Sequence, residues 1–107
     1  MVNINGETWK ILLVSPTHPG LRKSNGDLAW GTCNDLNKTI YINDSLSSFY
    51  TKKVLCHELT HAAMFSYNIE LSLEQEEVLA DLIATYGQEI VGMTNIIFKR
   101  IQQKGEA

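Results

Sequence analysis

The strongest constraint on the fold is a change in the pattern of the sequence near residue 47. Before this point, short runs of β-forming residues alternate with segments rich in Pro, Gly, Ser and Asn. After it, apolar residues recur at helical spacing. An order of strands first and helices afterwards predicts an α+β fold, in which a small N-terminal antiparallel sheet packs on two or three C-terminal helices.

Three segments of the N-terminal part are expected to form strands. They are residues 8–14, 28–33 and 39–43. The first contains Trp9 and a run of β-forming apolar residues, and no helix cap precedes it. The second and third flank a turn-rich connector at residues 34–38, which predicts a β-hairpin. Residues 15–27 hold both prolines and are expected to form a loop.

The second of two expected long helices begins at Leu73, where Ser72 and Gln75 form a capping box. Gly87 and Gly92 weaken this helix and are expected to kink or divide it. Its large apolar residues share one face, which is expected to pack against another part of the protein. They are Leu79, Leu82, Ile83, Tyr86, Ile90, Met93 and Ile97.

The first expected helix runs from a cap at Ser47 or Ser48 to about Tyr67 and contains His57-Glu58-Leu59-Thr60-His61. Residues four apart lie on one helix face, so the two histidines can offer nitrogens to one zinc ion. Glu58 is rotated by about 100° from His57 and cannot easily join both histidines as a ligand. It can instead take the proton from a zinc-bound water, whose pKa zinc lowers to roughly 7.

The alternative for this pentapeptide is a pair of histidines with ordinary partners in a core. Such short motifs also arise by chance. A buried helix would more readily carry Leu or Ala at positions 57 and 61, because buried polar groups need partners. We therefore take His57 and His61 as metal ligands and Glu58 as the catalytic base.

A hydrolytic zinc site usually has three protein ligands and one open position. The second helix carries four acidic candidates for the third ligand. They are Glu74, Glu76, Glu77 and Asp81. Glu77 and Asp81 share a face with Ala80 and Ala84, and these small residues allow a close approach to the first helix. On this face Glu77 would bind zinc and Asp81 would accept a hydrogen bond from a ligating histidine. Glu76 is the rival ligand, and an acidic first turn that complements the helix dipole is the non-metal alternative.

These residues together resemble the ImmA/IrrE-type metallopeptidases, which pair HExxH with a downstream Glu-x-x-Ala-Asn/Asp-x-Phe-Ala element. The counterpart in this chain is the segment EVLADLIA at residues 77–84. The similarity extends over about residues 28–87, and it is greatest to the short versions found in phages and prophages. Asp81 stands where Asn is more usual in the family, and Ile83 replaces the aromatic residue.

The resemblance implies a minimal zincin-like fold and one zinc ion held by His57, His61 and Glu77. It also implies that Glu58 is the general base for hydrolysis of peptide bonds in a peptide or protein substrate. Repressor cleavage and other regulatory roles of larger members transfer poorly, because no additional domain is visible in the sequence.

Length and composition restrict the other possibilities. The 107 residues fit one domain, residues 1–107. A net charge of −3 argues against a nucleic-acid partner. With no signal pattern and no apolar run of membrane-spanning length, we expect a cytoplasmic protein in which Cys33 and Cys56 are thiols. The sequence does not predict the oligomeric state.

Three points stay open from the sequence alone. One hairpin arm, residues 28–33 or 39–43, either pairs with an extended substrate or only covers the core. A donor for the reaction's oxyanion is also needed, and His18 is the first candidate to test. The other candidates are Tyr50, Tyr67 and Tyr86. The second functional hypothesis is a zinc-stabilised interaction module or regulator without proteolytic activity, in which Cys33 could complete a closed site.

Overall fold

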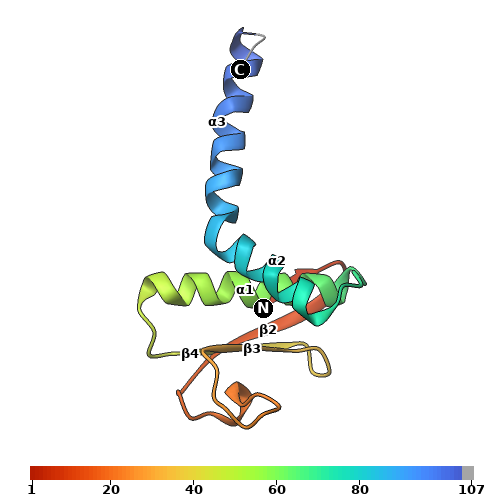
Figure 1. The fold of residues 1–107 in the computed structure, drawn as a ribbon, viewed down its shortest axis with the longest axis vertical. Coiled ribbons are helices and arrows are strands. Elements are labelled where there is room, and N and C mark those ends of the chain that lie inside the picture. The colour runs from red at the N-terminus through yellow and green to blue at the C-terminus, as the bar shows by residue number, and fades with distance from the viewer. Residues whose placement is uncertain (105–107) are drawn as a thin grey trace.

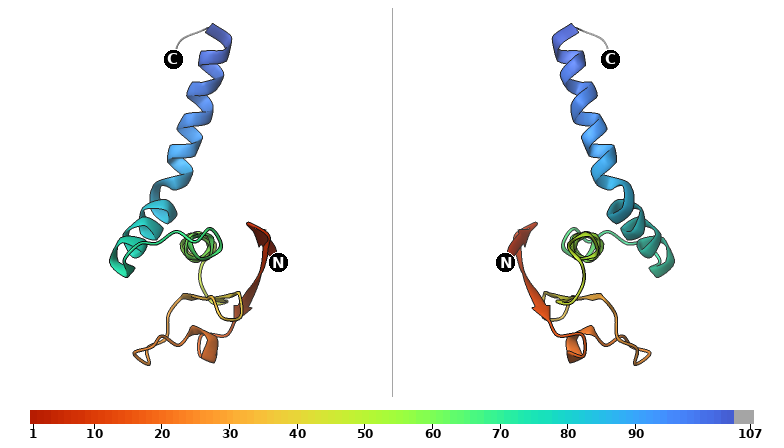
Figure 2. Two further views of the ribbon diagram at one scale, coloured as in Figure 1. Left: turned by 90° about the vertical axis from the view of Figure 1, so that its right-hand side faces the viewer. Right: turned by 90° about the vertical axis from the view of Figure 1, so that its left-hand side faces the viewer.

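The computed structural model of the chain describes residues 1–104 and confirms the predicted α+β class (Figure 1). Helix α1 lies over one face of a four-stranded sheet, α2 packs against α1, and α3 projects away from both (Figure 1, Figure 2). The strands are β1 (Val2–Ile4), β2 (Glu7–Val14), β3 (Gly31–Asn34) and β4 (Thr39–Asn43). The helical segments are η1 (Pro19–Leu21), α1 (Ser48–Ser66), α2 (Leu73–Leu82), η2 (Ile83–Gly87) and α3 (Gln88–Lys104).

The sheet is mixed, with the strand order β1-β2-β4-β3. The predicted hairpin is present, since β3 and β4 pair antiparallel. The prediction of an antiparallel sheet is wrong for the central pair, where β2 and β4 run parallel with Ile11 opposite Ile40. The chain crosses from the end of β2 to the outer edge of the sheet, so β3 runs back and β4 returns in the direction of β2. A sequence pattern of strands does not reveal this crossing.

One additional strand and one shifted strand start also differ from the prediction. Strand β1 was not expected, and it forms a hairpin with β2 through Asn5 and Gly6, which have φ angles of 48° and 83°. Positive φ at both positions is typical of the tight turns that Asn-Gly favours. The first hairpin arm begins at Gly31 rather than at residue 28, because Leu28 forms only an isolated bridge with Arg22.

The core lies between the sheet and α1. It contains the fully buried side chains of Trp9, Ile40, Ile42 and Ala62, against which Leu55 and Leu59 of α1 pack. Period two places Ile40 and Ile42 on the same face of β4, which is the face that α1 covers. The Trp9 indole N–H donates to Ser66 Oγ at 2.8 Å, so the tryptophan also fixes the end of α1.

We expect Trp9→Ala to lower the free energy of unfolding by about 3–5 kcal/mol, because it removes the largest fully buried side chain. Urea denaturation monitored by far-UV circular dichroism measures this change. Leu36→Ala is the matched control, since Leu36 is 97% exposed, and it should change stability by only about 0.5 kcal/mol. Equal effects of the two substitutions would contradict this assignment of the core.

Both predicted helix starts are confirmed. The Ser47 hydroxyl accepts the N–H of Tyr50 at 3.3 Å, and α1 follows without interruption to Ser66. Ser72 and Gln75 form the reciprocal bonds of a capping box at the start of α2. These caps satisfy N–H groups that have no partner within the first turn. They therefore fix where each helix begins, and with it the position of His57 on α1.

The predicted division of the second long helix is present near Gly87. Segment η2 is a π-helical turn that ends at this residue, while Gly92 lies inside α3. The expected packing of the apolar face holds only at its start, where Leu79 and Ile83 are half-buried and α2 and η2 contact α1. It is wrong for α3, which buries none of its side chains within residues 1–104. Ile90 and Ile97, for example, are 51% and 42% exposed. The helix leaves the body of the molecule at η2, so its apolar residues extend beyond the sheet and α1 (Figure 2). No helix within residues 1–104 has the length and apolar character required to cross a bilayer.

Candidate metal centre

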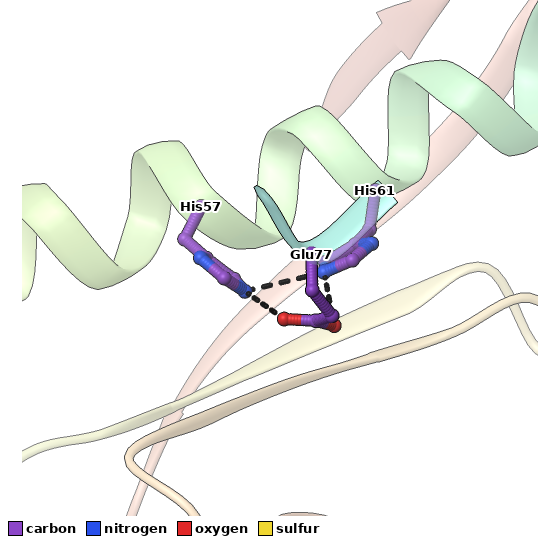
Figure 3. A group of neighbouring side chains, drawn as sticks. All are labelled: His57, His61 and Glu77. Atoms are coloured by element: carbon purple, nitrogen blue, oxygen red, sulfur yellow. Dashed lines mark hydrogen bonds and ion pairs between the residues drawn. The ribbon is translucent and has the colours of Figure 1, made fainter. Parts of the chain in front are cut away.

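Three side chains from α1 and α2 converge on one point (Figure 3). One turn of α1 separates His57 from His61, and their Nε2 atoms lie 3.2 Å apart. Glu77 of α2 reaches both rings, with Oε1 3.0 Å from His61 Nε2 and Oε2 3.3 Å from His57 Nε2. Each residue offers one ligand atom, and these atoms lie within 4.8 Å of one another. The sequence-predicted set of His57, His61 and Glu77 is therefore brought together in space.

The outer nitrogen of each imidazole faces a carboxylate. His57 Nδ1 lies 3.0 Å from Asp81 Oδ1, in the place that the sequence predicted for this acceptor. His61 Nδ1 lies 2.6 Å from Glu76 Oε1. Glu76 and Glu77 were rivals for the third ligand in the sequence, and the structure separates them. Glu76 accepts from the outer side of His61, whereas Glu77 lies on the inner side with the two Nε2 atoms.

This pattern of contacts fits a bound zinc ion. A neutral histidine whose Nδ1–H donates to a carboxylate presents a lone pair at Nε2. In the centre of this site two such lone pairs would face each other and the Glu77 carboxylate, an arrangement that a cation stabilises. Two histidines and a glutamate also form a known ligand set of catalytic zinc sites. The residues present thus match the chemistry that zinc requires.

Glu58 lies beside this centre and is largely buried, with 7% of its surface exposed. Burial raises the pKa of its carboxyl group, and the charge of Glu77 raises it further, while His57 and His61 lower it. The residue lines both of the cavities that border the site. Glu58 is therefore positioned to hold or release a proton next to the three converging side chains.

Gly31 allows β3 to approach α1 closely beside Glu58. A Cβ atom at this position would lie 2.5 Å from Val54 Cγ1 and 3.2 Å from Glu58 Cγ. Any side chain would have to displace one of these two residues of α1. The sequence did not predict this packing role, because it depends on a contact between distant segments.

Two cavities border the site and share His57 and Glu58. The larger, of about 680 Å³, extends along β3 and past Glu76 and Glu77. The smaller, of about 340 Å³, is lined also by Trp30 and Tyr50, whose rings meet edge to face with centroids 5.3 Å apart. Both cavities are thus lined in part by Gly31 of β3 and by Glu58 of α1.

The strand order resolves which hairpin arm has a free edge. Strand β4 lies between β2 and β3 and is paired on both sides. Strand β3 is at the edge of the sheet, and its residues line the larger cavity. Main-chain groups on a free edge can pair with an extended peptide. Within the described part of the chain, β3 is therefore the arm that can serve this purpose.

The candidates for an oxyanion donor differ in whether they line these two cavities. Tyr50 lines the smaller cavity. His18 lines neither of the two cavities within residues 1–104, and its Nδ1 accepts the Gly20 N–H at 2.9 Å while its ring stacks on Tyr41. Tyr67 and Tyr86 are likewise absent from the lining of both cavities.

Cys33 lines the larger cavity but does not join the three converging side chains. Burial raises the pKa of its thiol to about 12, and the charge of Glu58 adds to this shift. Zinc binds the thiolate form of cysteine, which this environment disfavours. Among residues 1–104, Cys33 and Cys56 are both free cysteines.

Comparison with known proteins gives one match. The protein family Peptidase_M78, described as the IrrE N-terminal-like domain, matches residues 13–90. This range contains β3, β4, α1, α2 and all the residues of the candidate centre. No curated protein and no solved structure matches the chain.

Proposed function

Because the chain belongs to the family of IrrE N-terminal-like domains, a peptidase family, we propose that it is a zinc metallopeptidase that hydrolyses peptide bonds. The observation that carries this proposal is the convergence of His57 Nε2, His61 Nε2 and the Glu77 carboxylate beside the buried Glu58. His57, His61 and Glu77 would hold one zinc ion. The substrate is a peptide, or an extended segment of a protein.

The donor set supports an open site rather than a closed structural one. Structural zinc sites usually have four protein ligands, whereas three residues converge here among those that the structure describes. A purely structural site also has no use for a carboxylate in the position of Glu58. These two features favour a peptidase over a zinc-stabilised interaction module.

The side chains at the centre have separate roles in hydrolysis. When bound, zinc supplies the Lewis acidity that polarises a substrate carbonyl and acidifies water. Glu58 takes the proton of the attacking water and passes it to the nitrogen of the leaving group. Asp81 and Glu76 hold the two imidazole rings in the tautomer and orientation that point Nε2 inward.

Strand β3 orients the substrate in this proposal. Its free edge offers main-chain N–H and C=O groups to an extended peptide beside the larger cavity. Gly31 keeps that edge close to Glu58, so a peptide paired with β3 can place the bond to be cut next to this carboxylate. The two cavities that Glu58 lines leave room for the residues that flank the cleaved bond.

Incubation of the zinc-loaded protein with a complex peptide mixture tests this function, with new peptide ends identified by mass spectrometry. We expect cleavage that stops when 1,10-phenanthroline removes the metal and returns when zinc is added, because the metal supplies the Lewis acidity. A serine-protease inhibitor is the control and should have no effect. A zinc-loaded protein that leaves every peptide in the mixture intact would refute the proposed activity.

A further inference from the structure

Helix α3 presents an apolar surface that the rest of the molecule does not cover. No side chain of this helix is buried, and Figure 1 shows it projecting away from the sheet and α1. Seven large apolar side chains of α3 are between 42% and 59% exposed. They are Ile90, Val91, Met93, Ile96, Ile97, Phe98 and Ile101. A surface of this kind on a projecting helix marks a contact with another molecule.

Four of these seven residues form one stripe along α3. At about 100° per residue, Ile90, Met93, Ile97 and Ile101 fall within an arc of roughly 80°. They extend from the first turn of the helix to its last and therefore follow its whole length. A stripe of this width and length suits pairing with a second helix along its axis.

The charged residues of α3 indicate what that second helix is. Glu89 and Arg100 lie on the same edge of the stripe, about 20° apart in helical projection and eleven residues apart along the chain. When two copies of a helix pair antiparallel, the same edges of their stripes face each other. Glu89 of each copy then lies within about one turn of Arg100 in the other, which gives two symmetric ion pairs.

A parallel pair would lack this complementarity. The same edges would lie on opposite sides of the pair, so Glu89 could not meet Arg100. The basic residues on or beside the stripe near the end of α3 would instead gather at one end of the pair, where they repel one another. They are Arg100 and Lys104. The charges thus select the antiparallel arrangement of two identical helices.

We infer that the protein forms a homodimer in which α3 pairs antiparallel with α3 of a second copy. The apolar stripe supplies the stability of this interface, and the two pairs of Glu89 with Arg100 set its direction. The candidate metal centre lies on α1 and α2, so each copy keeps its own site. The inference is independent of the proposed peptidase activity, because none of the residues that converge on the metal centre belongs to α3.

Sedimentation equilibrium on the full chain tests this inference with two charge variants. Arg100→Glu makes the edge of the stripe acidic, and Glu89→Arg makes it basic. Each variant alone opposes like charges twice across the interface, so its self-association should weaken by roughly tenfold. An equimolar mixture of the two should restore an association as tight as that of the wild-type protein, since each helix then faces the opposite charge.

Lys99→Glu is the matched control. It makes the same change of charge as Arg100→Glu one residue away, but on the side of α3 opposite the stripe. It should leave the dimer intact, and circular dichroism should show unchanged helix content in all three variants. A monomeric wild-type protein would overturn the inference. A mixture of the two edge variants that associates no better than either alone would overturn the antiparallel pairing.

Discussion

Replacing Glu58 by Gln is expected to reduce zinc-dependent peptide hydrolysis by about 10²–10⁴-fold, the usual contribution of a general base. Glutamine has nearly the shape of glutamate but cannot accept the proton of the attacking water. Because Glu58 lies outside the group of converging ligand atoms, zinc affinity should remain close to the wild-type value. Initial rates on a peptide that the wild-type protein cleaves, together with a zinc titration, measure both quantities.

Glu74→Gln is the control for the loss of a carboxylate. Glu74 is exposed in the first turn of α2 and lines neither cavity that borders the centre. Its replacement should leave hydrolysis unchanged. Persistence of wild-type rates in Glu58→Gln would show that the proposed base is wrong, even if the metal site itself is correct.

The second large effect is a loss of zinc affinity, which we expect for Glu77→Ala. The substitution removes one of three protein ligands and leaves the two histidines alone. Glu76→Ala removes only the acceptor of the His61 Nδ1–H and should weaken zinc binding by about 10–100-fold. The loss in Glu77→Ala should exceed that range. Competition with a chromophoric chelator gives both affinities.

Glu74→Ala is the control for zinc affinity. It removes an acidic residue of the same helix that has no contact with the histidines. A larger loss of zinc affinity in Glu76→Ala than in Glu77→Ala would contradict the assignment. It would mean that the two glutamates exchange roles when the metal binds.

The features that the sequence predicted well depend on local interactions. The caps at Ser47 and Ser72 and the weak point at Gly87 all act within a few residues of the chain. The spacing of His57 and His61 fixes their relative position once α1 forms. Helical geometry also placed Glu77 and Asp81 on one face of α2, and the structure brings both toward the histidines.

The features that the sequence did not predict depend on how distant segments meet. The parallel pairing of β2 with β4 follows from the path of the chain after β2, which no local pattern encodes. The contact between Glu76 and His61 depends on the rotation of α2 against α1. By contrast, β1 had a readable signal, because Asn5-Gly6 between β-forming residues is a typical hairpin turn.

Helix α3 shows a different limit of the sequence pattern. Its helical periodicity was read correctly, but the pattern does not say which molecule covers an apolar face. Within the described chain the face stays exposed. The positions of Glu89 and Arg100 became informative only when the structure showed that this face was free.

Zinc-edge X-ray absorption spectroscopy, combined with metal analysis of the purified zinc-loaded protein, tests the central claim most directly. The site described here predicts one zinc per chain with only nitrogen and oxygen ligands, at about 2.0–2.2 Å. A sulfur ligand at about 2.3 Å, or less than one tightly bound zinc per chain, would contradict a centre formed by His57, His61 and Glu77.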